Sequence, residues 1–259
     1  MANQHYIVGD CLDFMKSNPA QTMEVTITSP PYNINIPYGT YKDTLPGEDY
    51  LNWMEEVFLQ VRRVTTFDGH FFLQAGGTSE YPDKPFKLLQ RAQKAGWTLQ
   101  NQILWVKSIA LNDDDSRGHF KPVNSKRYLN NLYEFIFHLT PDGNRPIDRL
   151  AIGVPYKDKS NIKRYSGTKG DKRCRGNVWY LPYETVASAK SHPAAFPIDL
   201  PLNCIKLSGK TGTVFDPFAG SGTTLHAASI LGQDAIGLDL DPGYLEVYEH
   251  EKDKYGPKS

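Results

Sequence analysis

Short apolar segments alternate with segments of helical periodicity along most of the chain, and this alternation restricts the possible folds more than any other feature. Between residues 47 and 64 apolar side chains recur at steps of three and four, which predicts a helix with one buried face. Strand-like apolar runs precede it at residues 5–8 and 25–27 and follow it at residues 70–73. Strands connected by helices form parallel sheets covered by helices, so we predict an α/β fold.

The alternation continues near the C-terminus and is interrupted in the middle of the chain. Residues 108–190 are polar, charged and rich in turn-forming residues apart from a strand-like stretch at 133–137, which predicts an inserted, loop-rich region that serves recognition. We expect residues 1–107 and 191–259 to be the two halves of one domain. The further predicted elements are strands at 99–106, 213–215 and 235–240 and helices at 85–95, 197–207, 221–231 and 242–254.

Composition argues against several classes of protein. The chain has 259 residues and 29 Lys+Arg against 29 Asp+Glu, and this zero balance, taken over the whole chain, speaks against a nucleic-acid partner. No apolar run is long enough for a membrane span, and the first residues lack the order of a secretion signal. Cys11, Cys174 and Cys204 are odd in number and far apart, which fits free thiols in a reducing cytoplasm and argues against a metal site.

A glycine-rich turn stands between a predicted strand and a predicted helix. It runs Asp-Pro-Phe-Ala-Gly-Ser-Gly-Thr-Thr from Asp216 to Thr224, and its glycines allow a sharp turn that brings backbone N–H groups of the helix N-terminus to a ligand. A Walker A loop is excluded because no Gly-Lys-Ser/Thr follows. Asp239, at the end of the next strand, is placed to accept the hydroxyls of a ribose. Each feature alone also suits an ordinary turn or helix cap; together they favour an adenosyl-type ligand.

A second loop follows the strand at 25–27 and contains two consecutive prolines. Prolines fix φ and disfavour helix at the preceding residue, so the loop formed by Ser29, Pro30, Pro31 and Tyr32 is rigid. The Ser29 hydroxyl and the Pro30 carbonyl can accept the hydrogens of an exocyclic amine, and the Tyr32 ring can stack on a planar base. This loop therefore predicts a site that binds a base and prepares its amine for attack.

With these two loops the sequence resembles the amino-group DNA methyltransferases, which methylate cytosine N4 or adenine N6 with S-adenosylmethionine. The run Ser29-Pro30-Pro31-Tyr32 resembles the catalytic motif of that family. The glycine-rich turn and Asp239 resemble its cofactor loop and its ribose-binding acid. Three shorter stretches, at residues 9–12, 175–179 and 192–197, resemble further family segments, so the resemblance covers nearly the whole chain.

The resemblance also implies which residues hold the cofactor and which fold carries them. The order of the motifs, with the catalytic loop before the cofactor loop, is that of the circularly permuted beta group, whose fold is a Rossmann-like sheet of seven mostly parallel strands. Both loops would then meet at the carboxyl edge of the sheet, where open α/β sheets bind ligands. The implied cofactor-binding residues are Asp10, Cys11, His192, Phe196, Asp216, Phe218, Gly220, Ser221, Gly222, Thr223 and Asp239.

For the reaction, the resemblance implies that the target base leaves the duplex and stacks on Tyr32. Family members with serine at the position of Ser29 are mostly cytosine-N4 enzymes, whereas Asn33 is common beside adenine-type loops, so we predict cytosine N4 and keep adenine N6 as the alternative. A methyltransferase that acts on protein glutamine and a non-catalytic nucleic-acid binder fit these residues less well. Three of the four tryptophans are expected in the core rather than in the site: Trp53, Trp97 and Trp105.

A basic segment within the predicted recognition region changes the meaning of the zero net charge. Between residues 157 and 175 eight cations stand against two acids, a net charge of 8 − 2 = +6, with Tyr165 among them and Tyr156 directly before them. Phosphate contacts by such a segment bind duplex DNA in a salt-dependent way. We therefore predict double-stranded DNA as the partner, and the family resemblance leaves room for a restriction endonuclease of the same specificity. The predicted DNA-binding residues are Lys157, Lys159, Lys163, Arg164, Lys169, Lys172, Arg173 and Arg175.

Overall fold

The computed structural model describes residues 2–34, 40–41, 43–108, 126–129, 131–163, 170–182 and 196–255. Their core is an eight-stranded sheet with the strand order β1-β8-β7-β2-β3-β5-β4-β6. Every neighbouring pair is parallel except the two that involve β5. The strands are β1 (Gln4–Val8), β2 (Met23–Thr28), β3 (Thr65–Ala75), β4 (Thr98–Ser108), β5 (Tyr133–Thr140), β6 (Val178–Pro182), β7 (Val214–Asp216) and β8 (Ala235–Asp239).

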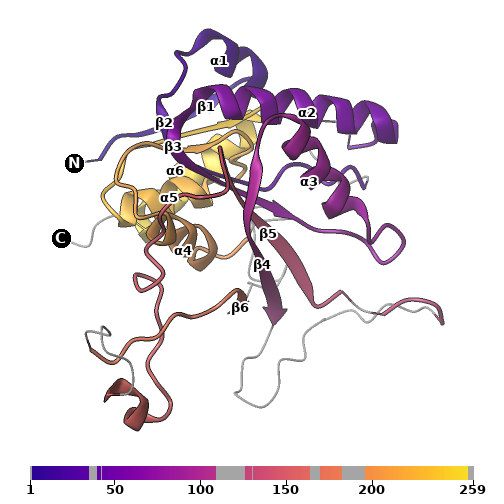
Figure 1. Ribbon diagram of the computed structural model, residues 1–259. Helices are drawn as coiled ribbons and strands as arrows, with labels where there is room; N and C mark the ends of the chain where they lie inside the picture. The colour runs from indigo at the N-terminus through magenta and orange to yellow at the C-terminus, as the bar shows by residue number, and fades with distance from the viewer. Residues whose placement is uncertain are drawn as a thin grey trace.

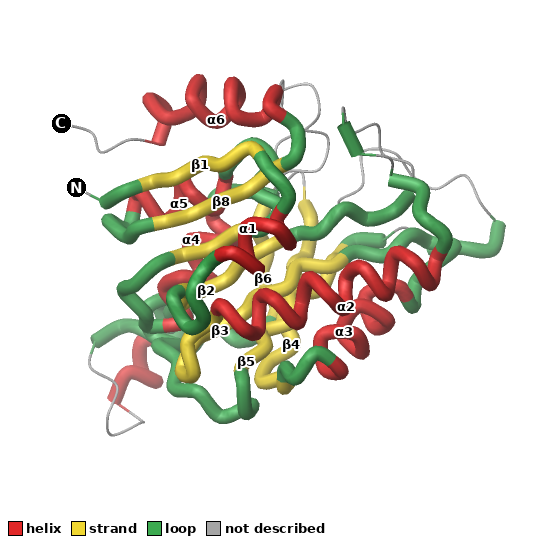
Figure 2. The backbone as a smooth tube through the Cα atoms, turned by 90° about the horizontal axis from the view of Figure 1, so that it is seen from above, coloured by secondary structure: helices red, strands yellow, loops and turns green. Residues whose placement is uncertain are grey.

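Helices cover both faces of this sheet, as Figures 1 and 2 show. One apolar cluster joins the sheet to α1, α2 and α3, and a second joins it to α4, α5 and α6. The consecutive residues Phe71 and Phe72 pack into different clusters, because successive side chains of a strand point to opposite faces. The helices are α1 (Cys11–Ser17), α2 (Gly47–Val64), α3 (Lys84–Lys94), α4 (Asp199–Ser208), α5 (Thr223–Ile230) and α6 (Pro242–Tyr255), with a short 3-10 helix η1 (Lys159–Lys163).

The predicted α/β fold is confirmed, and the long helix α2 has the predicted bounds. The sheet has one strand more than the expected seven. The extra pairing involves β6, which lies inside the stretch expected to be loop, because its short run of alternating exposed and buried residues pairs with β4 only in the folded chain. Helix α1 is also absent from the sequence prediction, since its seven residues are too few for a periodic pattern.

The strand order places the site. Because β1, β8, β7 and β2 are parallel neighbours, the loops that follow these strands all leave the sheet at one edge. The predicted catalytic loop follows β2, and the glycine-rich turn follows β7, the strand beside it. No helix among the described residues is long and apolar enough to cross a membrane.

Candidate functional site

A cleft opens at the carboxyl edge of the central strands. It encloses about 650 Å³ of empty space, part of it open to solvent. Its wall is formed by residues from the loops after β1, β2, β7 and β8, with further side chains from α2 and from the start of α6. Residues of both the proline loop, Ser29 and Pro31, and the glycine-rich turn, Phe218 and Gly220, line it. The two predicted halves of the site therefore share one cavity, as the sequence implied.

The glycine-rich turn depends on the conformation of its glycines. Gly220 and Gly222 both have positive φ, +50° and +79°, which side chains other than hydrogen rarely allow. A Cβ on Gly222 would also lie 2.3 Å from Cδ2 of Tyr248, whose ring fills the space beside the turn. The hydroxyl of Tyr6 donates to the carbonyl of Gly220 at 2.6 Å. The turn is thus held from both sides, and Gly222 caps the N-terminus of α5.

Two carboxylates, Asp239 and Asp10, also line the cleft. Asp239 accepts the N–H of Gly220 on Oδ2 and the N–H of Asp241 on Oδ1, each at 3.0 Å, and burial raises its pKa. Asp10 caps helix α1, where Oδ1 accepts the N–H groups of Leu12 at 2.7 Å and Asp13 at 3.1 Å. Each carboxylate keeps lone pairs that these bonds do not use. Both residues line the cleft, so both can accept hydrogen bonds from a ligand.

Asp216 joins the catalytic strand to the cofactor turn. Its carboxylate is buried, and it accepts the hydroxyl of Thr28 at 2.7 Å on one oxygen and that of Thr224 at 2.6 Å on the other. Burial raises its pKa to about 6, against these hydrogen bonds, which lower it. Thr28 immediately precedes Ser29. Asp216, a predicted cofactor-binding residue, is thus not among the residues that line the described cleft, and its side chain fixes two loops relative to each other.

The proline loop is held by residues of α2 and α3. Tyr50 donates its hydroxyl to the carbonyl of Pro31 at 2.7 Å. Lys84 donates to the carbonyl of Tyr32. The next residue, Asn33, has a φ of +52° and donates its backbone N–H to a carboxylate oxygen of Asp43 at 2.6 Å. These contacts make the loop a fixed part of the site.

Tyr32 is tied down at its hydroxyl. The oxygen lies 2.9 Å from Oε2 of Glu134 and accepts a hydrogen bond from Nε2 of Gln74 at 2.7 Å. Burial, followed by the charge of Glu134, raises the pKa of Tyr32 well above its usual value, so the phenol stays protonated. The hydroxyl of Tyr32 is therefore held by the side chains of Gln74 and Glu134.

Several residues of the cleft were missed by the sequence argument. Trp53 is expected in the core from the sequence, but it lines the cleft, with its ring edge-on to Phe218 at 5.6 Å and stacked on Tyr41 at 5.7 Å. Trp53 lies on α2 beside the stripe of buried residues and not within it, and this position in the sequence pattern could have indicated that its side chain lines the cleft. Tyr244, at the start of α6, also lines the cleft, and burial raises its pKa to about 12. Trp97 and Trp105 are buried in the core as predicted.

The other predicted cofactor residues occupy different positions. Cys11 lines the cleft, and burial raises the pKa of its thiol to about 12, which keeps the thiol protonated at neutral pH. Ser221 is buried within the turn, and Thr223 begins α5. Phe196 packs against the apolar cluster that contains the buried residues of α4, and it is not among the residues that line the described cleft. His192 lies outside the described residues.

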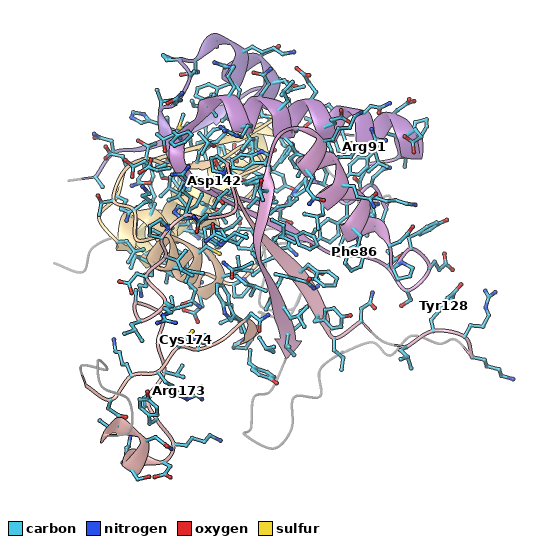
Figure 3. All side chains as sticks on the ribbon, in the orientation of Figure 1. Phe86, Arg91, Tyr128, Asp142, Arg173 and Cys174 are labelled. Carbon is cyan, nitrogen blue, oxygen red and sulfur yellow. The ribbon has the colours of Figure 1, made fainter. Side chains whose placement is uncertain are left out.

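The basic segment forms an arm outside the sheet, on which Figure 3 labels Arg173 and Cys174. Lys157, Lys172 and Arg173 are exposed on it, and the backbone of Arg173 pairs with that of Val154. Lys159 forms an ion pair with Asp171. Arg175 is half-buried and donates to the carbonyl of Ile152 at 3.2 Å, which indicates an anchoring role. Arg164, Lys169 and the side chain of Lys163 lie outside the described residues.

A comparison with protein-family models identifies the family of the chain. The model of the N6/N4 DNA methylases matches residues 23–250, a span that contains the proline loop, the glycine-rich turn and Asp239. The chain belongs to this DNA methylase family. This match confirms the resemblance to the amino-group DNA methyltransferases that the sequence motifs indicated.

The sequence of the methylase is similar to curated type II methyltransferases and to a DNA adenine methyltransferase. It is 28% identical over 253 residues to the type II methyltransferase M.ScaI of Streptomyces caespitosus, a match that covers 92% of this chain and 78% of the relative. It is 27% identical over 251 residues to the DNA adenine methyltransferase YhdJ of Escherichia coli (strain K12), covering 93% of this chain and 80% of the relative. Both matches span most of each protein.

Solved structures share the fold of the methylase. The PvuII DNA methyltransferase, which is cytosine-N4-specific, has a TM-score of 0.72 at 19% identity, covering 96% of this chain and 86% of that one. The TTHA0409 protein of Thermus thermophilus, in its complex with S-adenosyl-L-methionine, has a TM-score of 0.65 at 22% identity, covering 100% and 96%. These likenesses support the permuted α/β methyltransferase fold.

Proposed function

We propose that the methylase transfers a methyl group from S-adenosylmethionine to the N4 amine of a cytosine in double-stranded DNA, at a specific sequence. One observation carries the proposal: the loop with Ser29 and Pro31 and the turn with Phe218 and Gly220 line the same cleft, although they are far apart in the chain. A methyl donor and a flipped base placed in that cleft are brought together by these two loops. Positioning of this kind supplies much of the acceleration of a transfer between two bound groups.

S-adenosylmethionine is the methyl donor, and the cleft residues fit it. Asp239 has unused lone pairs for ribose hydroxyls, and Asp10 has them for the adenine amine. The rings of Trp53 and Phe218 provide an apolar wall for the adenine. When bound, the cofactor supplies an electrophilic methyl group on a sulfonium.

The proline loop supplies the groups that act on the base. The carbonyl of Pro30 and the hydroxyl of Ser29 accept the two amine hydrogens, because each of these oxygens carries lone pairs that can accept a hydrogen bond. The Tyr32 ring stacks on the base. Hydrogen bonds at both amine hydrogens draw the nitrogen lone pair toward the methyl group, so no covalent enzyme intermediate is needed.

Adenine N6 is the second candidate, and two observations favour it. Asn33 follows Tyr32 and lies in the fixed loop, and one curated relative is a DNA adenine methyltransferase. We place cytosine first because of Ser29. The two bases present the same amine geometry to this loop, so only the product distinguishes them.

The experiment incubates the purified protein with labelled S-adenosylmethionine and unmethylated genomic DNA, followed by nucleoside analysis. We expect N4-methylcytosine; N6-methyladenine alone would establish the second candidate. Tyr32→Ala is expected to abolish turnover and to leave cofactor affinity, measured by calorimetry, within twofold. Phe67→Ala is the matched control, because Phe67 is an exposed aromatic near the start of β3, away from the cleft edge, and its loss should change neither quantity.

The partner and the location complete the proposal. Relatives named as type II methyltransferases suggest that a restriction endonuclease acts on the same sequence. The exposed cations of the arm contact the DNA backbone on either side of the target. We place the methylase in the cytoplasm of a prokaryotic cell, where the chromosome is accessible to it.

A further inference from the structure

Two side chains from neighbouring strands contact the hydroxyl of Tyr32, a third side chain contacts one of these two, and none of the three belongs to the two loops that carry the reaction. Gln74 lies on β3, Glu134 on β5 and Lys107 on β4. Gln74 and Glu134 are buried, with exposed fractions of 1% and 8%. A carboxylate so deep in a protein requires compensation, because charge is poorly solvated there. Lys107 provides it through an ion pair with Glu134.

The hydrogens of this network can be assigned from its donors and acceptors. The phenol has one hydrogen, which goes to the charged oxygen of Glu134, 2.9 Å away, because a carboxylate is a stronger acceptor than an amide. Nε2 of Gln74 has two hydrogens; one goes to the oxygen of Tyr32 at 2.7 Å and the other to Oε2 of Glu134. The ammonium group of Lys107 forms an ion pair with the second oxygen of Glu134, Oε1. The hydroxyl of Tyr32 thus has a donor and an acceptor at fixed positions.

The backbone restricts the ring from another side. A Cβ on Gly76, the residue after β3, would lie 2.8 Å from Cε2 of Tyr32 and 2.8 Å from the carboxyl group of Glu134. The edge of the ring therefore packs against a position where only glycine fits. With the hydroxyl bound on one side and the edge packed on the other, the ring plane has little freedom to turn.

We propose that Glu134, supported by Gln74 and Lys107, is a positioning residue that fixes the plane of the Tyr32 ring on which the target base stacks. The inference rests on the proposed role of Tyr32. Its consequence is that the hydroxyl of Tyr32 acts toward the protein and only the ring face acts toward the base. The network then affects the chemical step rather than cofactor binding, because its residues do not line the cofactor cleft in the described structure.

The test measures kcat, KM for unmethylated genomic DNA, cofactor affinity and thermal stability for Tyr32→Phe, Glu134→Ala and the double variant. Tyr32→Phe keeps the ring and removes the bond to a charged acceptor, so we expect kcat to fall about 10- to 100-fold, the range of one such bond. KM and cofactor affinity should stay within twofold. In the Tyr32→Phe background, Glu134→Ala should lower kcat no further, because its partner atom is already absent.

Controls separate this role from general stability. Glu24→Ala removes a carboxylate of β2 that accepts the N–H of Gly212 at 3.0 Å, away from the cleft lining, and should leave kcat unchanged. If Glu134→Ala fails to fold because Lys107 loses its partner, Tyr32→Phe alone decides, since it changes no buried charge. Wild-type kcat in Tyr32→Phe, or an equal loss from Glu134→Ala with and without the phenol, overturns the inference. An active Tyr32→Ala would instead overturn the proposed role of Tyr32 itself.

Discussion

Gly222→Ala is the substitution for which the structure defines the outcome most closely. A residue with a side chain at φ +79° costs about 1–2 kcal/mol in backbone strain. The new methyl group would also lie 2.3 Å from the ring of Tyr248, and overpacking of this kind costs about 1–3 kcal/mol. The sum is a loss of about 2–5 kcal/mol in the free energy of unfolding, reduced by about 0.4–1 kcal/mol because alanine also restricts the unfolded chain.

Gly232→Ala is a matched control near the other end of the same helix, α5. Gly232 has a φ of +69°, but a Cβ there would meet no atom within 4 Å. The backbone strain and the unfolded-state effect are therefore shared, and the difference between the two variants isolates the contact with Tyr248. That difference should be about 1–3 kcal/mol.

Urea unfolding of both variants measures this difference, and calorimetry with S-adenosylmethionine measures its effect on the site. We expect weaker cofactor binding only in Gly222→Ala, because Gly220 and Asp239 are joined across the turn that would shift. Tyr248→Leu in the Gly222→Ala background should restore part of the lost stability. Equal stabilities of Gly222→Ala and Gly232→Ala would refute the reasoning.

Two further predictions concern pH and salt. Burial lowers the pKa of His70 to about 4 and of His138 to about 3, so between these values and the unfolded value of 6.5 mainly the unfolded chain takes up protons. The contribution of these two histidines to the free energy of unfolding is therefore present above pH 6.5 and falls by about 2 kcal/mol per histidine at pH 5, measured by urea unfolding. Replacement of the exposed Lys157, Lys172 and Arg173 by glutamine should weaken DNA binding and reduce the slope of log K against log salt by up to about 3, measured by fluorescence anisotropy.

Controls for these two predictions come from the same chain. The folded pKa of Asp216 is raised to about 6, so ionisation of this carboxyl group lowers stability as pH rises and acts against the histidines. Asp216 is present both in the wild type and in the His70→Leu/His138→Leu variant, so its contribution cancels when the two proteins are compared. If this variant loses as much stability between pH 7 and pH 5 as the wild type does, the first prediction is contradicted. Lys87→Gln, on α3, is the control for salt, and an unaltered slope in the arm variant would place the DNA elsewhere.

The parts of the site that could be predicted from the sequence are those with local chemistry. The turn with Gly220 and Gly222 and the loop with Ser29 and Tyr32 each carry their conformational reason within a few residues, and Asp239 stands at a strand end. Strand order then brings them together, as parallel α/β sheets do.

The parts that could not be predicted depend on register and packing. Gln74 and Glu134 meet because β3 and β5 pair with Ala75 opposite Phe135, a match that no local pattern defines. Trp53 reaches the cleft because α2 packs on the sheet with its apolar stripe buried, which leaves the Trp53 side chain beside that stripe and at the cleft. The family resemblance implies that Asp10 binds the cofactor, but its role as the cap of α1 depends on a helix that the sequence pattern does not predict.

The strand order also has a consequence for synthesis of the chain. The edge strand β1 pairs with β8, and β2 pairs on one side with β7, so both of the first strands wait for partners near the C-terminus. At a ribosomal rate of about 5–20 residues per second, that delay is roughly 10–50 s. During this time the backbone edge of β2 that pairs with β7, and the apolar side chains of Val25 and Ile27, stay open to other chains and to chaperones. The cofactor cleft is therefore among the last parts of the nascent protein to form.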